Sequence, residues 1–244
     1  MARKEGLLGR KVGMTQVFGE DGSHVPVTVI QAGPCTVTAV RSKAADGYDA
    51  LQLGFEAKKK NVTKPMQGHF AKNNLPPVKV MREFSVIQDV AEQTAEGIKV
   101  GDKVLVDIFA DEKYVDITGV SKGRGFAGVV RRHKFGGGPK SHGHMFQVQG
   151  SIGASSNPSR VFKGQRMPGQ MGVQNVTVRN LRILGIDLDD NLLMVEGAVP
   201  GHRDGYLVIS KSKKPPRERR GFAGSTTVDP LKAAKKAAQA AKKK

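Results

Sequence analysis

The strongest match to a catalytic or cofactor-binding motif in this sequence is a glycine-rich hexapeptide formed by Gly123, Gly125 and Gly128. Together with Val130 it fits the pattern G-x-G-x-x-G-x-V, in which a loop covers the phosphates of a nucleotide. A dinucleotide site also needs a helix after the loop and an acidic residue about 20 positions further on. Here basic residues follow the loop and the next acid is Asp187. The context argues against a nucleotide-binding enzyme.

A second enzyme-like motif is the tripeptide His202-Arg203-Asp204, which matches the start of a protein-kinase catalytic loop. The asparagine that such a loop carries five residues after its aspartate is replaced by Ile209, and Asp-Phe-Gly does not occur in the chain. No serine triad or carboxylate pair can be recognised from spacing. We therefore expect no enzymatic activity and no catalytic residue.

The pair His142 and His144 could supply two metal ligands, but no second cluster of ligands accompanies it and Cys35 is distant in sequence. Imidazole rings also stack on nucleic-acid bases and hydrogen-bond to them. This second interpretation is favoured, and no metal or other cofactor is expected.

The charge of the chain is concentrated in two segments. Residues 117–186 contain eleven Lys or Arg, 14 of the 30 glycines and no Asp or Glu, and residues 211–244 have a net charge of +10. Because the whole chain carries +18, the remaining 140 residues are slightly acidic, at −3. Solubility alone would not require 70 residues without an acid, so the pattern predicts a polyanionic partner. The residues expected to bind it are Lys122, Arg124, Arg131, Arg132, Lys134, Lys140, His142, His144, Arg160, Lys163, Arg166 and Arg179.

Length and composition restrict the class of protein. The 244 residues suffice for one domain or two small ones, and the single cysteine, Cys35, excludes an intramolecular disulfide framework and fits a reducing compartment. Neither a secretory signal nor an apolar run of about 20 residues is visible. We expect a soluble protein in the cytoplasm with no membrane partner.

The elements that must position these residues are mostly short strands. Alternating, β-branched runs bounded by Gly, Pro and Asp predict nine or ten antiparallel strands, which favours a closed barrel because closure removes exposed sheet edges. Two short helices are expected, around 68–73 and 89–96. The strands are expected at 6–18, 25–31, 35–42, 48–56, 78–86, 103–110, 114–120, 176–187, 191–199 and 205–210.

Residues 121–172 show no regular pattern of strands or helices. Glycines, Ser/Asn/Pro clusters and basic residues alternate there, with few apolar anchors. Little apolar burial offsets the entropy of ordering such a segment, so a partner must order it. We predict an arm that enters between phosphate backbones, where glycine permits close approach. Residues 1–120 and 173–210 are then the barrel, 121–172 the arm and 211–244 a basic tail.

Several sequence blocks resemble one family. GLLGRKVGMTQVF (6–18), VDITGVSKGRGFAGVVRRHKF (115–135), GSIGASSNPSRVFKGQRMPGQMG (150–172) and NLLMVEGAVPG (191–201) are similar to the universal ribosomal protein L-three of the large subunit, in its bacterial form. The resemblance spans nearly all of residues 4–210, in order.

The resemblance implies a mainly β fold: a closed antiparallel barrel of the translation-protein type with a long, irregular, glycine-rich basic extension. It further implies early binding to large-subunit rRNA near its 3′ end, neighbouring large-subunit proteins as partners, and an extension that reaches toward the peptidyl-transferase centre. Gln170 aligns with a glutamine that is methylated in some bacteria, which makes it a candidate substrate of a glutamine methyltransferase.

Two features depart from the family pattern. Residues 146–149 read Phe-Gln-Val-Gln where members usually carry a His-Arg-x-Pro sequence, so contacts at this bend cannot be transferred. The lysine-rich tail 211–244 matches no family block; rRNA contact and disorder are equally weighted for it. Two rival classes stay open from the residues alone. One is a nucleoid-type DNA-binding protein, which would leave the glycine-rich arm unexplained, and the other is an RNA-modifying enzyme, which would need a cofactor site that we do not find.

Overall fold

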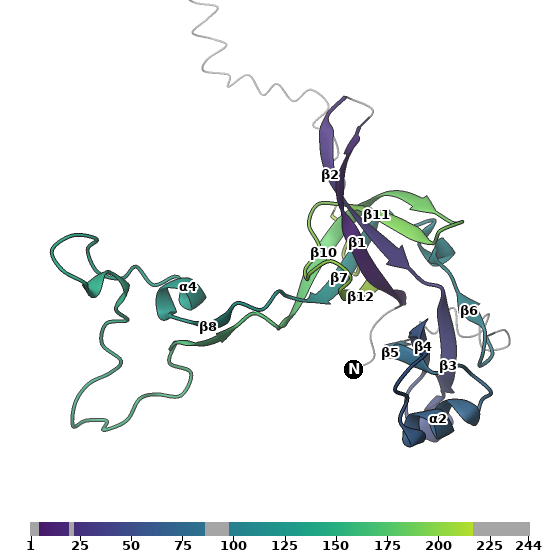
Figure 1. Cartoon of the computed structure of the whole chain (residues 1–244), viewed down its shortest axis with the longest axis horizontal. Coiled ribbons are helices and arrows are strands. Elements are labelled where there is room, and N and C mark those ends of the chain that lie inside the picture. The colour runs from purple at the N-terminus through teal and green to yellow at the C-terminus, as the bar shows by residue number, and fades with distance from the viewer. Residues whose placement is uncertain (1–4, 20–21, 86–97, 217–244) are drawn as a thin grey trace, which may run out of the picture. The chain divides into compact units, whose positions relative to one another are not determined.

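The chain forms a closed antiparallel barrel, as expected, but the barrel has six strands and not the nine or ten that were expected. A computed structural model describes residues 5–19, 22–85 and 98–216, so the helix expected at 89–96 and most of the basic tail lie outside the described residues. Neighbouring strands in the barrel follow the order β1-β12-β7-β10-β11-β2 (Figure 1). Their bounds are β1 Gly6–Phe18, β2 His24–Ala32, β7 Tyr114–Val120, β10 Asn175–Asp187, β11 Leu192–Glu196 and β12 Tyr206–Lys211.

The barrel closes around inward-facing aliphatic side chains. Along β7 every second residue is buried, and Val115 and Ile117 are both 0% exposed. Leu7 of β1 and Ile209 of β12 are equally inaccessible. Burial of each such side chain contributes about 1.5–3 kcal/mol, so the alternation seen in the sequence is what selects the inner face.

Four further strands, expected within the barrel, form a separate sheet of order β5-β4-β3-β6. The sequence pattern shows which face of a strand is buried but does not specify its partner, and both sheets bury their apolar faces in one continuous core that includes Leu8 and Ile30 of the barrel with Val37 and Phe55 of the sheet. Their bounds are β3 Cys35–Arg41, β4 Ala50–Ala57, β5 Val78–Ser85 and β6 Lys103–Val104.

The strand expected at 103–110 is wrong beyond its first two residues. After β6 the chain turns into a 3-10 helix, η1 (Val106–Phe109), and Val106 and Phe109 are both 0% exposed. A spacing of three residues matches one 3-10 turn, which puts both side chains on the same side. Two α-helices complete this part of the chain, α1 (Lys43–Asp46) and α2 (Lys64–Ala71); α2 begins four residues before the helix expected at 68–73.

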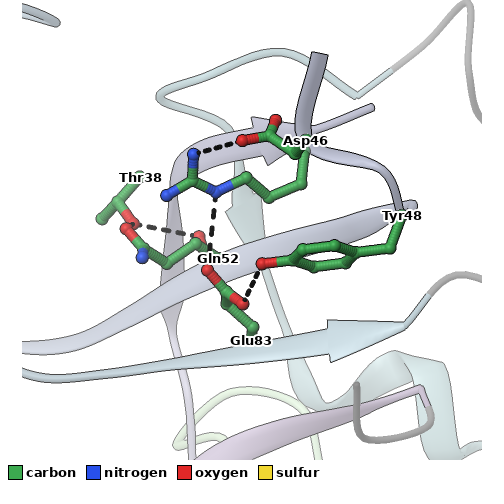
Figure 2. A network of polar contacts seen from close by, with 6 residues as sticks. Thr38, Asp46, Tyr48, Gln52 and Glu83 are labelled. Carbon is green, nitrogen blue, oxygen red and sulfur yellow. Dashed lines mark hydrogen bonds and ion pairs between the residues drawn. The ribbon is translucent and has the colours of Figure 1, made fainter. Parts of the chain in front are cut away.

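Polar side chains connect the three longer strands of this sheet. The Arg41 guanidinium lies 2.9 Å from the Asp46 carboxylate and 3.5 Å from that of Glu83. In Figure 2 the Tyr48 hydroxyl points at Glu83, to which it donates a hydrogen bond of 2.9 Å, and the Thr38 hydroxyl donates to the Gln52 amide oxygen at 2.8 Å. The β3–β4 connection is thereby tied to β5.

Among the described residues, no helix combines the length and apolar character needed to cross a membrane.

Candidate nucleic-acid interface

The candidate interface begins where β7 and β10 continue past the barrel into a hairpin. The Ser121 amide donates to the Gln174 carbonyl oxygen at 2.9 Å, and the Val173 amide donates back to that of Ser121 at 3.2 Å. Beyond these bonds, β8 (Gly125–Ala127) and β9 (Gly169–Met171) pair antiparallel (Figure 1). The root of the arm therefore has a regular structure that the sequence did not indicate.

A short helix, α4 (Val129–His133), follows β8 and fixes the two halves of the hairpin together. The Arg132 guanidinium donates to the Met167 carbonyl oxygen at 2.7 Å, and the His133 ring nitrogen lies 3.1 Å from the same oxygen. Val129 is only 2% exposed, so it anchors the helix. Between α4 and β9 the chain is irregular apart from one 3-10 turn, η2 (Met145–Gln147), as the glycine content predicted.

The departure from the family pattern at residues 146–149 coincides with η2. The Phe146 side chain is 46% exposed. A Cβ atom added to Gly137 would lie 2.2 Å from the Phe146 carbonyl oxygen, so any side chain at position 137 would overlap that oxygen. Two backbone segments therefore approach closely at this bend, and the approach requires glycine at position 137.

The twelve residues expected to bind a polyanion lie almost entirely at the surface. Eleven of them are exposed and Arg132 is half-buried. None forms an ion pair with a carboxylate within the described ranges, whereas Arg10, Arg41, Lys79 and Lys211 elsewhere do. Because their positive charges are not neutralised within the protein, they remain available to external anions.

A pocket at the arm root brings four predicted residues together. Its volume is about 540 Å³, and it is lined by the side chains of Lys122, Arg124, Arg132 and Gln170. The wall is completed by Ser121, His133, Met171, Gly172 and Gln174, which sequence reasoning did not select. The position of His133 next to Arg131-Arg132 was a signal that could have identified it. No carboxylate lines the pocket, so it favours an anionic group such as a phosphate.

The other predicted residues do not line this pocket. Arg131 lies on α4, Lys134 is the residue that ends it, and Arg179 lies on β10. On the irregular part of the arm, the Arg160 guanidinium lies 5.7 Å from the centre of the exposed Phe162 ring, where a cation and a π-face are presented side by side. The remaining predicted residues of this part are Lys140, His142, His144, Lys163 and Arg166.

A buried lysine adds positive charge near the arm root. The Lys11 ammonium donates to the Val199 carbonyl oxygen at 2.8 Å, and the residue is 9% exposed. Burial lowers the pKa of Lys11, and the nearby charge of Lys122 lowers it further. This repulsion between two cations would be relieved by an anion bound at Lys122.

Among the described residues, no three His, Cys, Asp or Glu side chains lie close enough together to hold a metal ion. A closed β-barrel that carries a hairpin of cations without carboxylate partners among the described residues is typical of a nucleic-acid-binding protein.

Comparison with known proteins shows the family to which the chain belongs. The sequence model of a family described as Ribosomal protein L3 matches residues 61–191. The chain is 62% identical to the large ribosomal subunit protein uL3 of Koribacter versatilis over 244 residues, which cover 98% of this chain and 99% of that protein. It is 47% identical to the uL3 of Pelobacter propionicus, with 86% of this chain and 99% of that protein covered, and 50% identical to that of Herpetosiphon aurantiacus, with 86% and 97% covered. The chain belongs to the ribosomal protein L3 family, whose members are structural proteins and not enzymes.

Proposed function

We propose that this protein is a structural constituent of the large ribosomal subunit in the cytoplasm and binds large-subunit rRNA. The observation that carries the proposal is the run of 70 residues, 117–186, that holds eleven Lys or Arg and no acid. Most of these cations are exposed, and none is paired with a carboxylate among the described residues. Without a carboxylate partner, each can neutralise a phosphate, and phosphate contacts are a dominant source of affinity for nucleic acid.

In this proposal each segment of the chain has its own role. Residues 1–120 and 173–210 form the body, residues 121–172 are the arm that enters rRNA, and residues 211–244 are a basic tail. The protein binds near the rRNA 3′ end early in assembly, next to other large-subunit proteins, and its arm reaches toward the peptidyl-transferase centre. His142 and His144 stack on bases or hydrogen-bond to them. Eight cations contact phosphates: Arg124, Arg131, Arg132, Lys134, Lys140, Arg160, Lys163 and Arg166.

The arm is expected to recognise RNA shape more than sequence. Its irregular stretch buries little apolar surface, so the protein alone supplies little energy to order it. Packing between rRNA helices supplies that energy when the subunit assembles. The pocket at the arm root is lined by residues of α4 and β9 and by the segment that precedes β8, and this structured root gives the entering arm a fixed starting direction.

Gln170 is proposed as the site of a glutamine methyltransferase. Its side chain is exposed on β9, and its only hydrogen bond among the described residues is a long one, 3.5 Å, to the adjacent Met171 carbonyl oxygen. The amide nitrogen is therefore accessible before rRNA covers the arm. Intact-mass measurement of the protein from its own ribosomes, with a Gln170→Ala control, should detect the mass of one added methyl group.

A salt titration tests the central proposal. If about eight phosphates are neutralised, the affinity of the full chain for a fragment of the rRNA 3′ domain should fall with a log–log salt slope of about −6. A slope near −1 would contradict the proposal. Duplex DNA of equal length serves as the control, because a DNA-binding protein would bind it at least as tightly as the rRNA fragment.

A further inference from the structure

A second acid-free segment lies outside the arm, in the part of the chain that is slightly acidic as a whole. Residues 57–82 contain no Asp or Glu and seven Lys or Arg. They connect β4 to β5 and include α2 (Figure 1). The basic residues of this segment are Lys58, Lys59, Lys60, Lys64, Lys72, Lys79 and Arg82.

Two of these seven cations are engaged within the protein. Lys79 pairs with the Glu56 carboxylate, and the Arg82 guanidinium donates to the Met81 carbonyl oxygen at 3.0 Å. The other five form no side-chain hydrogen bond or ion pair with any described residue, and all are exposed except the half-buried Lys58. They are unneutralised in the same way as the cations of the arm.

Two of the free lysines, Lys64 at the start of α2 and Lys72 directly after its last residue, lie on one face. Phe70, 2% exposed, packs its ring inward, and the Asn73 amide that follows the helix donates to the Thr38 carbonyl oxygen of β3 at 3.1 Å. Lys64 and Lys72 are eight residues apart, so they lie on one side of the helix, opposite Phe70 and about 12 Å apart along the axis.

A glycine separates these two lysines on the same face. Gly68 is exposed, and a Cβ added to it would meet no atom within 4 Å. Its φ is not positive, so neither packing nor backbone conformation requires glycine there, although glycine weakens a helix relative to alanine. The missing side chain leaves a flat strip of backbone between two cations, where a bulky chain can approach closely.

We propose that the outer face of α2, with the lysines at 58–60, is a second RNA-binding surface that receives the sugar–phosphate backbone of a folded RNA helix. This inference rests on the proposed function only for the nature of the partner. Phosphates accept from the lysines, and Gly68 lets the ribose backbone approach the helix.

An acidic protein fits this face less well than RNA. Protein interfaces depend on large apolar or aromatic anchors at their centre. Residues 57–82 contribute none of the large hydrophobic side chains that are exposed elsewhere on the described surface. The face therefore offers charge and close backbone approach, which suit a nucleic acid.

The test compares two triple variants of the full chain in the same rRNA salt titration. Lys60, Lys64 and Lys72 are changed to Gln in the first; the control changes Lys43, Lys99 and Lys103, which are equally exposed lysines outside the segment. The first variant should reduce the magnitude of the log–log slope by about 2, and the control should leave it unchanged. An unchanged slope for the first variant, or an equal loss for both, would overturn the proposal.

A Gly68→Leu variant probes the close approach without changing charge. It should keep or raise the melting temperature and weaken rRNA binding several-fold, whereas equal affinity would show that no RNA lies against the glycine. An arm variant, Arg124, Arg131 and Lys134 changed to Gln, separates the two proposals. If the arm variant reduces the magnitude of the log–log salt slope and the α2 variant does not, only the second surface is refuted. A slope near −1 for the wild-type chain refutes rRNA binding itself.

Discussion

The Arg132 guanidinium donates a 2.7 Å hydrogen bond to the main-chain oxygen of Met167, which lies 35 residues further along the chain. The bond closes the arm at its root, because Arg132 belongs to α4 on the outgoing half and Met167 precedes β9 on the returning half. The same guanidinium lies so close to Gly169 that an added Cβ would be 2.7 Å from it. One residue thus serves both as a structural clamp and as part of the basic pocket.

Replacing Arg132 with Ala should open the arm root without unfolding the barrel. A hydrogen bond from a charged donor contributes about 1.5–3 kcal/mol, and this one has only local pairing to support it. Hydrogen exchange at the amides of 167–171 should become faster, while the melting temperature changes little. Arg131→Ala is the matched control, since Arg131 is exposed and donates no side-chain hydrogen bond to a described residue. Equal exchange in both variants would contradict the clamp.

Gly172→Ala should disrupt the arm root more strongly than Gly125→Ala. Both glycines have positive φ, at 83° and 64°, so alanine introduces backbone strain of about 1–3 kcal/mol at each. A Cβ at Gly172 would also lie 2.2 Å from the Lys122 carbonyl oxygen, whereas the space beside Gly125 is open. Local exchange rates across β8 and β9 measure the difference. Similar rates in the two variants would show that the close approach is relaxed in solution.

The barrel was predictable because alternation marks buried faces, and several strands were found at their expected positions. Tyr114–Val120, for example, is the strand expected at 114–120. The division into a barrel and a separate sheet was not predictable, because the partner of a strand is chosen by long-range packing, as between Leu8 and Val37 in the common core.

The positive charge of the candidate interface could be predicted from the sequence, whereas the structure of the arm root could not. The exclusion of acids identified the arm, but its root acquires structure from pairs distant in sequence, such as Arg124 with Met171, whose backbone groups bond at 2.9 Å. The second acid-free segment, 57–82, was not visible in the net charge of the 140 residues outside 117–186 and 211–244. The Asp and Glu residues on either side of it offset its positive charge in that total. Charge runs are informative at the length of a single connection as well as over a whole domain.

Tyr206→Phe should loosen the attachment of the second sheet to the barrel. The Tyr206 hydroxyl, on β12, donates at 2.8 Å to the Glu56 carboxylate at the end of β4. Loss of this bond should lower the free energy of unfolding by about 1 kcal/mol, while the edge-on contact of the ring with Phe55 is retained. In a double-mutant cycle with Glu56→Gln the combined cost should be smaller than the sum, and strict additivity would exclude the coupling.

The same pair predicts a pH dependence. Hydrogen bonds from Lys79 and then from Tyr206 lower the pKa of Glu56 below its ordinary 4.5. The folded state therefore binds this proton more weakly than the unfolded chain, so its contribution to stability is present above pH 4.5 and is lost as the pH falls below it. Chemical denaturation between pH 3 and 6 should show a smaller acid-side loss in Glu56→Gln than in the wild type.

Cys35 should be unreactive in the native protein. The thiol is 0% exposed and lies 3.4 Å from the Leu8 carbonyl oxygen, and burial raises its pKa from 9.0 to about 12. Because the thiolate is the reactive form, a thiol reagent at pH 8 should label Cys35 only after denaturant is added. Rapid labelling without denaturant would contradict this burial.

The raised pKa of Cys35 also limits stability in alkali. The folded state holds the thiol proton more tightly than the unfolded chain, so the contribution of Cys35 is fully present below about pH 9 and is lost as the pH rises toward 12. Cys35→Ala should remove this alkaline loss while lowering stability at neutral pH through lost packing. If stability depends on pH in the same way in both proteins, ionisation of Cys35 does not destabilise the folded state.

Deletion of residues 122–171 should leave the barrel folded and remove the arm. The deletion joins Ser121 to Gly172, so that Gly172 and Val173 become a two-residue link between Ser121 and Gln174, which are already hydrogen-bonded across the ladder. Both link residues have positive φ, at 83° and 53°, as a type I′ hairpin turn requires. The junction thus resembles an existing turn and need not strain β7 or β10, so circular dichroism and the melting temperature should stay close to those of the full chain.

The deleted protein should nonetheless fail to enter stable large subunits, because the proposal assigns rRNA anchoring to the arm. Sedimentation of ribosomes from cells that carry only this variant measures the effect, and a Lys43→Ala variant, changed at an exposed lysine outside the arm, controls for expression. Normal subunits containing the armless chain would refute the assignment of anchoring to the arm. A folded variant that still binds the rRNA fragment weakly, with a slope reduced in proportion to the cations removed, would instead show that cations outside the arm bind RNA, on the α2 surface or in the basic tail.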